Sequence, residues 1–293
     1  MSALQKTGQL LILSILVSFF IVTGYFTERT GLWQETIIDT RDTSWKRNAD
    51  GVMTGAESIL LNGTRTCWLL IHGYGSTPAE FQLVAPLLHN STNATILVPL
   101  LPGHGTLPSD LQTTTWNDWN TAVVSSYDSL NSSCDTINVA GSSLGGALAV
   151  QLSQERPIHT LALIAPYTKA KKQLDQTLIN TFGGVLHYVK KTKIAAINNE
   201  TTRQLHRAYW NLPLKPLQQA REQLRTVEQL TPRAQLFIVI LAEHDNVINN
   251  NVGETYYERF KGKKALQWLP LSDHVASLDY DYETVAETVE KNT

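Results

Sequence analysis

The stretch "VAGSSLGGALA", residues 139–149, holds two serines and three glycines between an apolar run and an alanine-rich one. This order predicts the end of a strand, a tight turn and the start of a helix. Gly141, Ser143 and Gly145 fit the pattern G-x-S-x-G, which lifts a serine hydroxyl above the carboxyl edge of a sheet at a helix N-terminus. Ser143 is therefore the candidate nucleophile, and the alternative interpretation is a glycine-rich turn without a catalytic role.

A serine hydroxyl is a weak nucleophile at neutral pH, so it needs a base, and the base needs a group that fixes its tautomer. On this kind of turn the acid follows the serine along the chain, and the histidine follows the acid. Asp245 comes at the end of one apolar run and His274 comes after the next, so we expect both at the same sheet edge as Ser143. The alternative for each is a solvated loop position.

The other histidines after Ser143 fit this role less well. His244 directly precedes Asp245, and adjacent residues that leave a strand normally point apart. The remaining three precede a strand or lie in a long connection without a preceding strand-end acid: His159, His187 and His206.

The oxyanion of a tetrahedral intermediate needs hydrogen-bond donors. One donor is expected to be the N–H of Leu144, directly after the nucleophile, and the other an N–H in the loop "IHGYGS" after the first well-marked strand. We predict Tyr74 N–H as this second donor, with Gly73 and Gly75 letting the backbone approach the substrate. His72 is expected to brace the loop.

Short apolar runs alternate with longer helical stretches from about residue 56 onward. Such runs predict strands that are apolar on both faces, in a mostly parallel sheet with helices on both sides, and the fold class is therefore α/β. The runs are "TCWLLIH" (66–72), "ATILVP" (94–99), "TINVAG" (136–141), "TLALIAP" (160–166), "QLFIVIL" (235–241) and "ALQWLP" (265–270).

Residues 167–234 form a connection far longer than a crossover helix requires. A long connection in a compact domain is usually functional. It contains the helix-like pieces "QLDQTLINTFGGVLHYVKK" and "KPLQQAREQLRTVEQL". We expect a helical cap over the site.

The N-terminus is a separate object, because residues 10–26 form an almost unbroken apolar run. As a helix this run reaches roughly 25 Å, the short end of what spans a bilayer. Residues 1–26 are therefore a single-pass membrane anchor or a signal segment, and the protein is secreted if the segment is cleaved. Residues 27–55 are polar without a clear period and are expected to form a linker or stalk.

Composition limits the remaining classes. With 293 residues, 42 % of them apolar, and a formal net charge of −2, the chain suits one catalytic domain over residues 56–293 and no nucleic-acid partner. We expect no metal and no cofactor, since no metal-ligand spacing or phosphate-binding glycine pattern is present. The segment "DYDYE", residues 279–283, is interpreted as a solvated acidic helix start.

Several motifs in order carry a resemblance to a known family. The chain from about residue 56 to the end resembles the α/β-hydrolase superfamily, and within it the bacterial carboxylesterase and monoacylglycerol-lipase-like branch. This resemblance implies Ser143, Asp245 and His274 as a triad under a cap that shapes an acyl pocket. The motifs are "LLIHGYGSTPAEF", "LVPLLPGHGTLPSDLQTTTWNDW", "VAGSSLGG", "AEHDNVI" and "LSDHVASLD".

The expected activity is that of a serine hydrolase that cleaves carboxylic esters through an acyl-enzyme. The substrate class is short to medium acyl esters or monoacylglycerols, because esters need less leaving-group protonation than amides. Another serine hydrolase activity, such as a peptidase or thioesterase, is the alternative enzyme. The alternative from another class is a ligand-binding or scaffolding protein that keeps the fold without turnover.

The two cysteines lie at the amino-terminal ends of two strands. These strands are parallel neighbours in the sheet order that the resemblance implies. Cys67 starts the strand leading to "IHGYG" and Cys134 lies just before the strand leading to "GSSLG". Neighbouring strands lie about 4.8 Å apart, which is compatible with a disulfide. The alternative is two buried thiols. A bridge would favour a catalytic domain outside the cytoplasm.

Overall fold

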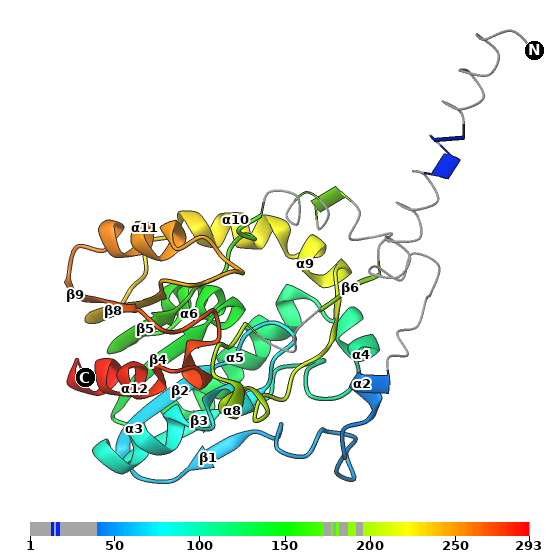
Figure 1. The fold of residues 1–293 in the computed structure, drawn as a ribbon. Helices are drawn as coiled ribbons and strands as arrows, with labels where there is room; N and C mark the ends of the chain where they lie inside the picture. The colour runs from blue at the N-terminus through cyan, green and yellow to red at the C-terminus, as the bar shows by residue number, and fades with distance from the viewer. Residues whose placement is uncertain are drawn as a thin grey trace, which may run out of the picture.

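The structure is a computed structural model that describes most of the chain from residue 40 onward. The described residues are 13, 14, 16, 17, 40–172, 177, 180, 181, 187–191 and 196–292. Their main feature is a seven-stranded sheet in the order β1-β3-β2-β4-β5-β8-β9, which carries helices on both faces (Figure 1). The predicted α/β class is confirmed.

Six strands of this sheet coincide with the six apolar runs of the sequence, and they run parallel to one another. Short β1 (Ile59–Leu61), which pairs antiparallel with β3 at one edge, was not predicted. Three residues are too few for a period to be visible in the sequence. The parallel strands are β2 (Thr64–Ile71), β3 (Ala94–Val98), β4 (Thr136–Ser142), β5 (Thr160–Ile164), β8 (Leu236–Ala242) and β9 (Lys263–Leu269).

Each face of the sheet is buried under its own layer of helices. In β2, Leu69 and Ile71 pack in one apolar cluster while Trp68 and Leu70 pack in the other, because successive side chains of a strand point to opposite faces. The first layer contains α5 (Trp116–Asn131), α6 (Leu144–Glu155), α10 (Arg221–Gln229) and α11 (Asn251–Arg259). The second contains α3 (Val84–Thr92) and α12 (Tyr282–Lys291).

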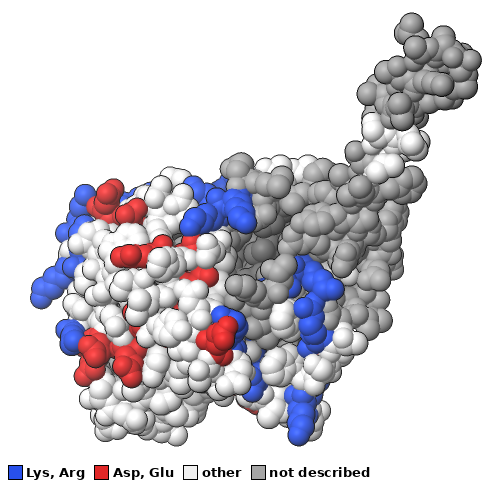
Figure 2. Space-filling view, in the orientation of Figure 1, with Lys and Arg blue, Asp and Glu red and all other residues white. Residues whose placement is uncertain are grey.

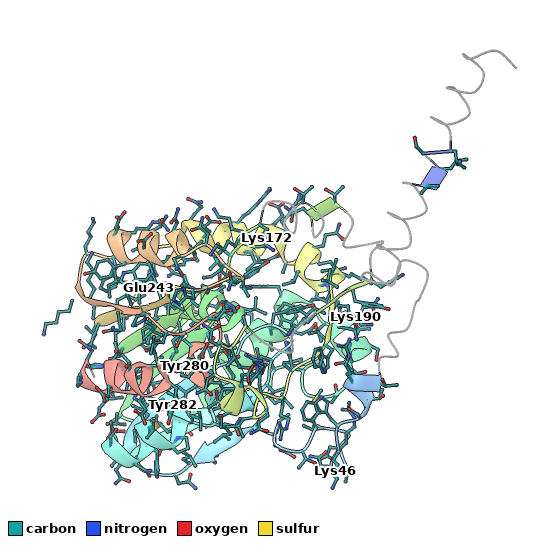
Figure 3. All side chains as sticks on the ribbon, viewed as in Figure 1. Lys46, Lys172, Lys190, Glu243, Tyr280 and Tyr282 are labelled. Atoms are coloured by element: carbon teal, nitrogen blue, oxygen red, sulfur yellow. A yellow bond between two sulfur atoms is a disulfide. The ribbon has the colours of Figure 1, made fainter. Side chains whose placement is uncertain are left out.

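The insertion between β5 and β8 is partly described and is less helical than the sequence indicates. Tyr188–Lys190 was expected in a helix, and this is wrong, because these residues form β6 and pair antiparallel with β7 (Asn211–Pro213). The pairing is distant in sequence, so local periodicity carries no trace of it. The helix-like stretch that follows is confirmed as α9 (Lys215–Gln219) and α10, after a short α8 (Glu200–Arg203). Between Lys172 and Lys190, labelled in Figure 3, few residues are described.

The polar segment before the hydrolase-like region packs against it from residue 40 onward. α2 (Thr40–Thr43) buries Asp42, whose carboxylate accepts hydrogen bonds from Trp210 N at 2.7 Å and from Asn211 Nδ2 at 2.6 Å. Met53 is also fully buried. The last part of the expected linker is thus bound to the insertion.

The apolar run at residues 10–26 lies outside the described residues apart from Leu13, Ser14, Leu16 and Val17. Among the helices that the described residues form, none has both the length and the apolar character needed to cross a bilayer.

Charges on the face drawn in Figure 2 are mixed. Asp and Glu side chains lie among Lys and Arg on the left part of this face, whereas the charged side chains on its right part are Lys and Arg. The exposed ion pairs of the described residues include Arg65 with Asp135 and Arg156 with Asp128, both at 2.7 Å. Pairs of this exposed kind contribute little to the free energy of unfolding, because solvent and salt screen their charges.

Cys67 and Cys134 form a disulfide in the structure, with their Cα atoms 6.0 Å apart. Cys67 lies opposite Ile137 in the parallel register of β2 and β4. The bond therefore joins the amino-terminal ends of the two strands whose carboxyl ends lead to the loop after Ile71 and to Ser143.

We predict that Cys67→Ala/Cys134→Ala lowers the free energy of unfolding by about 4 kcal/mol, since the bridge restrains the unfolded chain over a separation of 67 residues. Urea unfolding of the oxidised protein and of the double variant measures the difference. Wild-type protein in strong reductant is the control and should approach the double variant. Two free thiols in denatured protein purified without reductant would contradict the bridge.

Candidate active site

Ser143 occupies the turn between β4 and α6 with φ 53° and ψ −119°. A side chain at positive φ is strained, so the surrounding packing must hold it there. The flanking glycines permit that packing, since a Cβ on Gly141 would lie 2.2 Å from Gly145 O and one on Gly145 would lie 2.1 Å from Ile71 O. The turn therefore fits only where these two positions lack side chains.

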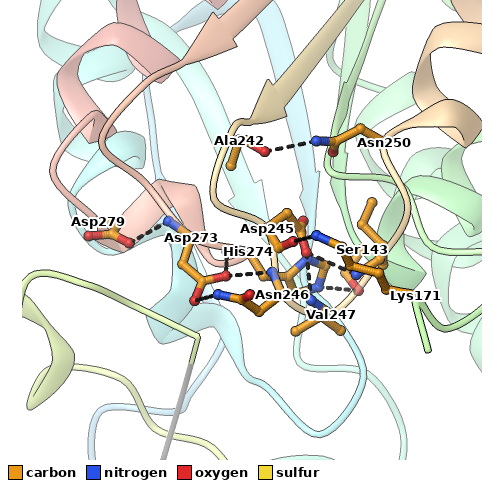
Figure 4. A network of polar contacts seen from close by, with 11 residues as sticks. Ser143, Lys171, Ala242, Asp245, Asn246, Val247, Asn250, Asp273, His274 and Asp279 are labelled. Carbon is orange, nitrogen blue, oxygen red and sulfur yellow. Dashed lines mark hydrogen bonds and ion pairs between the residues drawn. The ribbon is translucent and has the colours of Figure 1, made fainter. Parts of the chain in front are cut away.

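The structure brings Ser143, His274 and Asp245 together in one hydrogen-bonded chain (Figure 4). His274 Nε2 lies 2.9 Å from Ser143 Oγ, and His274 Nδ1 lies 2.8 Å from Asp245 Oδ2. Because the Asp245 carboxylate accepts, the proton sits on Nδ1 and Nε2 is left as the acceptor for the serine hydroxyl. This arrangement can activate the serine for attack on a carbonyl carbon.

Asp245 is fully buried, and backbone groups hold its carboxylate in place. Its Oδ1 accepts hydrogen bonds from Val247 N at 2.8 Å and Ile248 N at 2.9 Å, which leaves Oδ2 for the histidine. Lys171 Nζ donates to the backbone carbonyl of Asp245. The orientation of the carboxylate is therefore determined on both sides.

The pKa values of the pair move in opposite directions. Burial acts to lower the pKa of His274, but the charge and hydrogen bond of Asp245, with the charges of Glu80 and Asp273, outweigh it and raise the pKa above 6.5. Burial acts to raise the pKa of Asp245, and His274 together with the two backbone N–H groups outweighs it and lowers the pKa. The pair thus favours a charged imidazolium next to a carboxylate.

Two further buried acids, which the sequence did not indicate, hold the loop of His274. Asp273 Oδ1 accepts from His274 N at 2.7 Å and from Asn246 N at 3.0 Å, so it joins the histidine loop to the Asp245 loop. Asp279, fully buried, accepts from Asp273 N at 2.8 Å and from Asn198 N at 2.7 Å. The expectation of a solvated acidic helix start is therefore wrong here, because backbone N–H groups of the insertion and the loop surround the carboxylate.

The loop after β2 lies against the serine. Gly73 N donates to Glu80 Oε2 at 2.9 Å, and Gly75 adopts a φ of 66°. A Cβ on Gly73 would lie 3.2 Å from Ser143 Cβ, so the loop backbone passes directly beside the nucleophile. The backbone N–H groups of Tyr74 and Leu144 belong to this loop and to the first residue of α6, where oxyanion donors of this fold lie.

Histidines 72 and 206 brace this loop, as expected for His72. His72 Nε2 accepts from Leu101 N at 3.1 Å, so its Nδ1 carries the proton and donates to Gly73 O at 2.9 Å. Burial lowers the pKa of His72 well below 6.5, which keeps the ring neutral. His206 Nε2 lies 2.7 Å from Ser76 Oγ, and burial lowers the pKa of His206 to about 3.

The described part of the chain contains no group of three or more His, Cys, Asp or Glu side chains arranged to hold a metal ion.

Comparison with known proteins gives the family. Residues 68–288 match the model of the alpha/beta hydrolase family. The chain belongs to the α/β-hydrolase family. The match includes the serine turn, the Asp245 loop and the His274 loop of this hydrolase.

Relatives of known activity support the branch within the family. This hydrolase is 29 % identical over 238 residues to a thermostable monoacylglycerol lipase of Bacillus sp. strain H-257, covering 80 % of this chain and 93 % of the relative. It is 26 % identical over 227 residues to a carboxylesterase of Bacillus subtilis strain 168, covering 75 % and 89 %. The structure of a metagenome-derived lipolytic enzyme superposes with a TM-score of 0.74 at 27 % identity, covering 81 % and 96 %. The kinship with carboxylesterases and lipases and the class of enzyme, a carboxylic ester hydrolase, are confirmed.

We predict that Asp245→Asn leaves this hydrolase folded but lowers kcat by about 10⁴-fold, because an amide no longer fixes the Nδ1–H tautomer. Steady-state kinetics with a chromogenic ester measures the loss, and thermal unfolding checks the fold. Asn246→Ala, which removes a neighbouring side chain from the Asp273 contact, is the control and should retain far more activity. Near-normal kcat in Asp245→Asn would point to another acid.

The raised pKa of His274 predicts the pH dependence of turnover. The neutral ring is required to accept the serine proton, so kcat/KM should fall as the pH drops through a midpoint above 6.5. A profile of kcat/KM from about pH 5 to 9 locates this acid limb. A midpoint well below 6.5 would show that the Asp245 charge does not dominate at His274.

Proposed function

We propose that this hydrolase cleaves carboxylic esters through an acyl-enzyme, with Ser143 as nucleophile, His274 as general base and acid, and Asp245 as the orienting carboxylate. The observation that carries the proposal is the continuous hydrogen-bonded chain from Ser143 Oγ through both ring nitrogens of His274 to Asp245. Its three members come from three separate loops at the same edge of the sheet.

In the first half of the reaction, Ser143 Oγ attacks the ester carbonyl and its proton passes to His274 Nε2. The resulting oxyanion accepts hydrogen bonds from Tyr74 N–H and Leu144 N–H. When the intermediate collapses, the C–O bond to the alcohol breaks and His274 returns the proton to the leaving oxygen. Water then repeats the sequence on the acyl-serine and releases the acid.

The substrates that we propose are short to medium acyl esters or monoacylglycerols. The printed activities of the relatives, a monoacylglycerol lipase and a carboxylesterase, support both classes. An alcohol is a better leaving group than an amine and needs less protonation in the transition state, which favours esters over amides. Hydrolysis rates across a series of acyl lengths distinguish the two ester classes.

A non-catalytic ligand-binding protein on the same fold is the rival from another class, and a thioesterase or peptidase is the rival enzyme. The strained φ of 53° at Ser143 argues for catalysis, because a binding protein gains nothing from holding a serine in that conformation. Parallel assays with oxygen esters, thioesters and peptide anilides separate the enzymes.

The organisation proposed for the chain is a hydrolase domain over residues 56–293 with an insertion at about 167–234. Residues 1–26 are proposed as a membrane anchor or a cleaved signal, with the catalytic domain outside the cytoplasm. Fractionation of cells into membrane and soluble parts, followed by N-terminal sequencing, separates an anchor from a cleaved segment.

We predict that Ser143→Ala abolishes turnover of a chromogenic acyl ester and labelling by a fluorophosphonate, since both need the hydroxyl. Ser142→Ala is the matched control: Ser142 is the adjacent serine, is 1 % exposed and has an Oγ without a hydrogen-bond partner among the described residues. It should remain active and should be labelled. Full activity in Ser143→Ala would remove Ser143 as nucleophile.

A further inference from the structure

Glu80 is a buried carboxylate that the triad does not use. It lies in the short helix η1 (Pro78–Phe81) and is 2 % exposed. Removing a carboxylate from water costs several kcal/mol unless other groups compensate. Glu80 Oε2 accepts the hydrogen bond of Gly73 N at 2.9 Å, in the loop that passes beside Ser143.

The peptide groups around Gly73 are held from two sides. Gly73 N donates to Glu80, while Gly73 O accepts from His72 Nδ1 at 2.9 Å and from Ser76 N at 3.3 Å. The carbonyl of Gly73 and the N–H of Tyr74 belong to one planar trans peptide, so they point in opposite directions. His72 and Ser76 fix this carbonyl and so aim the Tyr74 N–H, while Glu80 fixes the preceding peptide, between His72 and Gly73.

This restraint matters because glycine has no side chain to limit its backbone angles. A Cβ on Gly73 would be tightly placed, since that atom would lie 3.2 Å from Ser143 Cβ and in contact with Glu80 Oε2 at 3.5 Å. The loop therefore has glycine, the residue with the least restricted backbone, directly before the Tyr74 N–H, which must be held in one orientation. The Glu80 bond supplies rigidity that the residue itself lacks.

Glu80 also acts on His274 through space. The negative groups that raise the pKa of His274 are Asp245, which hydrogen-bonds its ring, Asp273, which binds its backbone N–H, and Glu80. Burial lowers the pKa of Lys191, on the insertion, to about 8, although the negative charge of Glu80 acts to raise it. Glu80 therefore contributes negative potential from the oxyanion-loop side of the site.

We propose that Glu80 is a positioning residue for ester hydrolysis: it holds Gly73 so that the Tyr74 N–H faces the oxyanion, and its charge stabilises the imidazolium that forms at His274. The inference rests on the proposed roles of Ser143, His274 and Tyr74. It adds Glu80 to the three side chains of the triad, and Glu80 acts through the backbone at Gly73 and through His274.

Glu80→Gln tests the charge while keeping an oxygen that can accept from Gly73 N. We expect kcat to fall about 10- to 100-fold, less than for outright loss of an oxyanion donor, with KM nearly unchanged. The acid limb of kcat/KM should move to lower pH, because His274 loses one negative neighbour. Affinity for a trifluoromethyl ketone, which forms an oxyanion on Ser143, should fall in parallel with kcat.

Glu80→Asp and Asp118→Asn are the companion variants. Glu80→Asp keeps the charge but withdraws it by one methylene, so kcat should fall while the acid limb stays near that of the wild type. Asp118→Asn removes a carboxylate that accepts from Thr115 N at 2.8 Å at the start of α5. It should lower the melting temperature without moving kcat or the acid limb, which separates a positioning role from a structural one.

The outcomes distinguish this inference from the proposed function. A wild-type kcat and an unshifted acid limb in Glu80→Gln overturn the role of Glu80, while loss of activity in Ser143→Ala still supports the triad. Turnover by Ser143→Ala overturns the triad and the role of Glu80 with it. If Glu80→Gln does not fold, a Glu80→Asp variant with wild-type kcat overturns the inference instead.

Discussion

Close backbone packing between β2 and the turn at Ser143 is the constraint on which the site depends. The parallel register places Ile71 opposite Gly141, and Gly145 then lies against Ile71 O without space for a side chain. This contact helps to hold the serine at a φ of 53°, together with the hydrogen bond from Ser143 N to Ile164 O at 3.0 Å. The disulfide joins the opposite ends of the same two strands. The strained turn at Ser143 is therefore supported by β2 and β4, two strands that a disulfide links.

Buried carboxylates connect the loops that leave this edge. Asp245 orients the histidine, Asp273 joins the loops of Asp245 and His274, and Asp279 ties the histidine loop to Asn198 of the insertion. Loop backbone at a sheet edge lacks ladder partners, so its N–H groups need acceptors. A carboxylate can satisfy several of them at once, and its negative charge also favours a positive His274. Structural support and electrostatic tuning therefore come from the same side chains.

The sequence predicted the parts of the molecule that depend on local pattern. The six long strands are apolar on both faces, and the glycine spacing around Ser143 is specific because sterics demand it. Edge strand β1 was not predicted because three residues are too few to show a period, and the β6–β7 pair was not predicted because its pairing is distant in sequence. The buried roles of Glu80 and Asp279 were not predicted for a different reason. Each acid lies in a helix-start context, where a solvated side chain is the ordinary expectation, and only the fold reveals the backbone N–H groups that bind it.

The insertion is part of the framework that holds the site. Tyr74 hydroxyl donates to Pro213 O at 2.5 Å, and Ser76 Oγ lies 2.7 Å from His206 Nε2, so the insertion holds the loop after β2. Asn198 binds the histidine loop from the same insertion. Because these contacts join the loop after β2 and the loop of His274 to the insertion, the segments 196–199 and 206–213 are held in place by the two loops that flank Ser143.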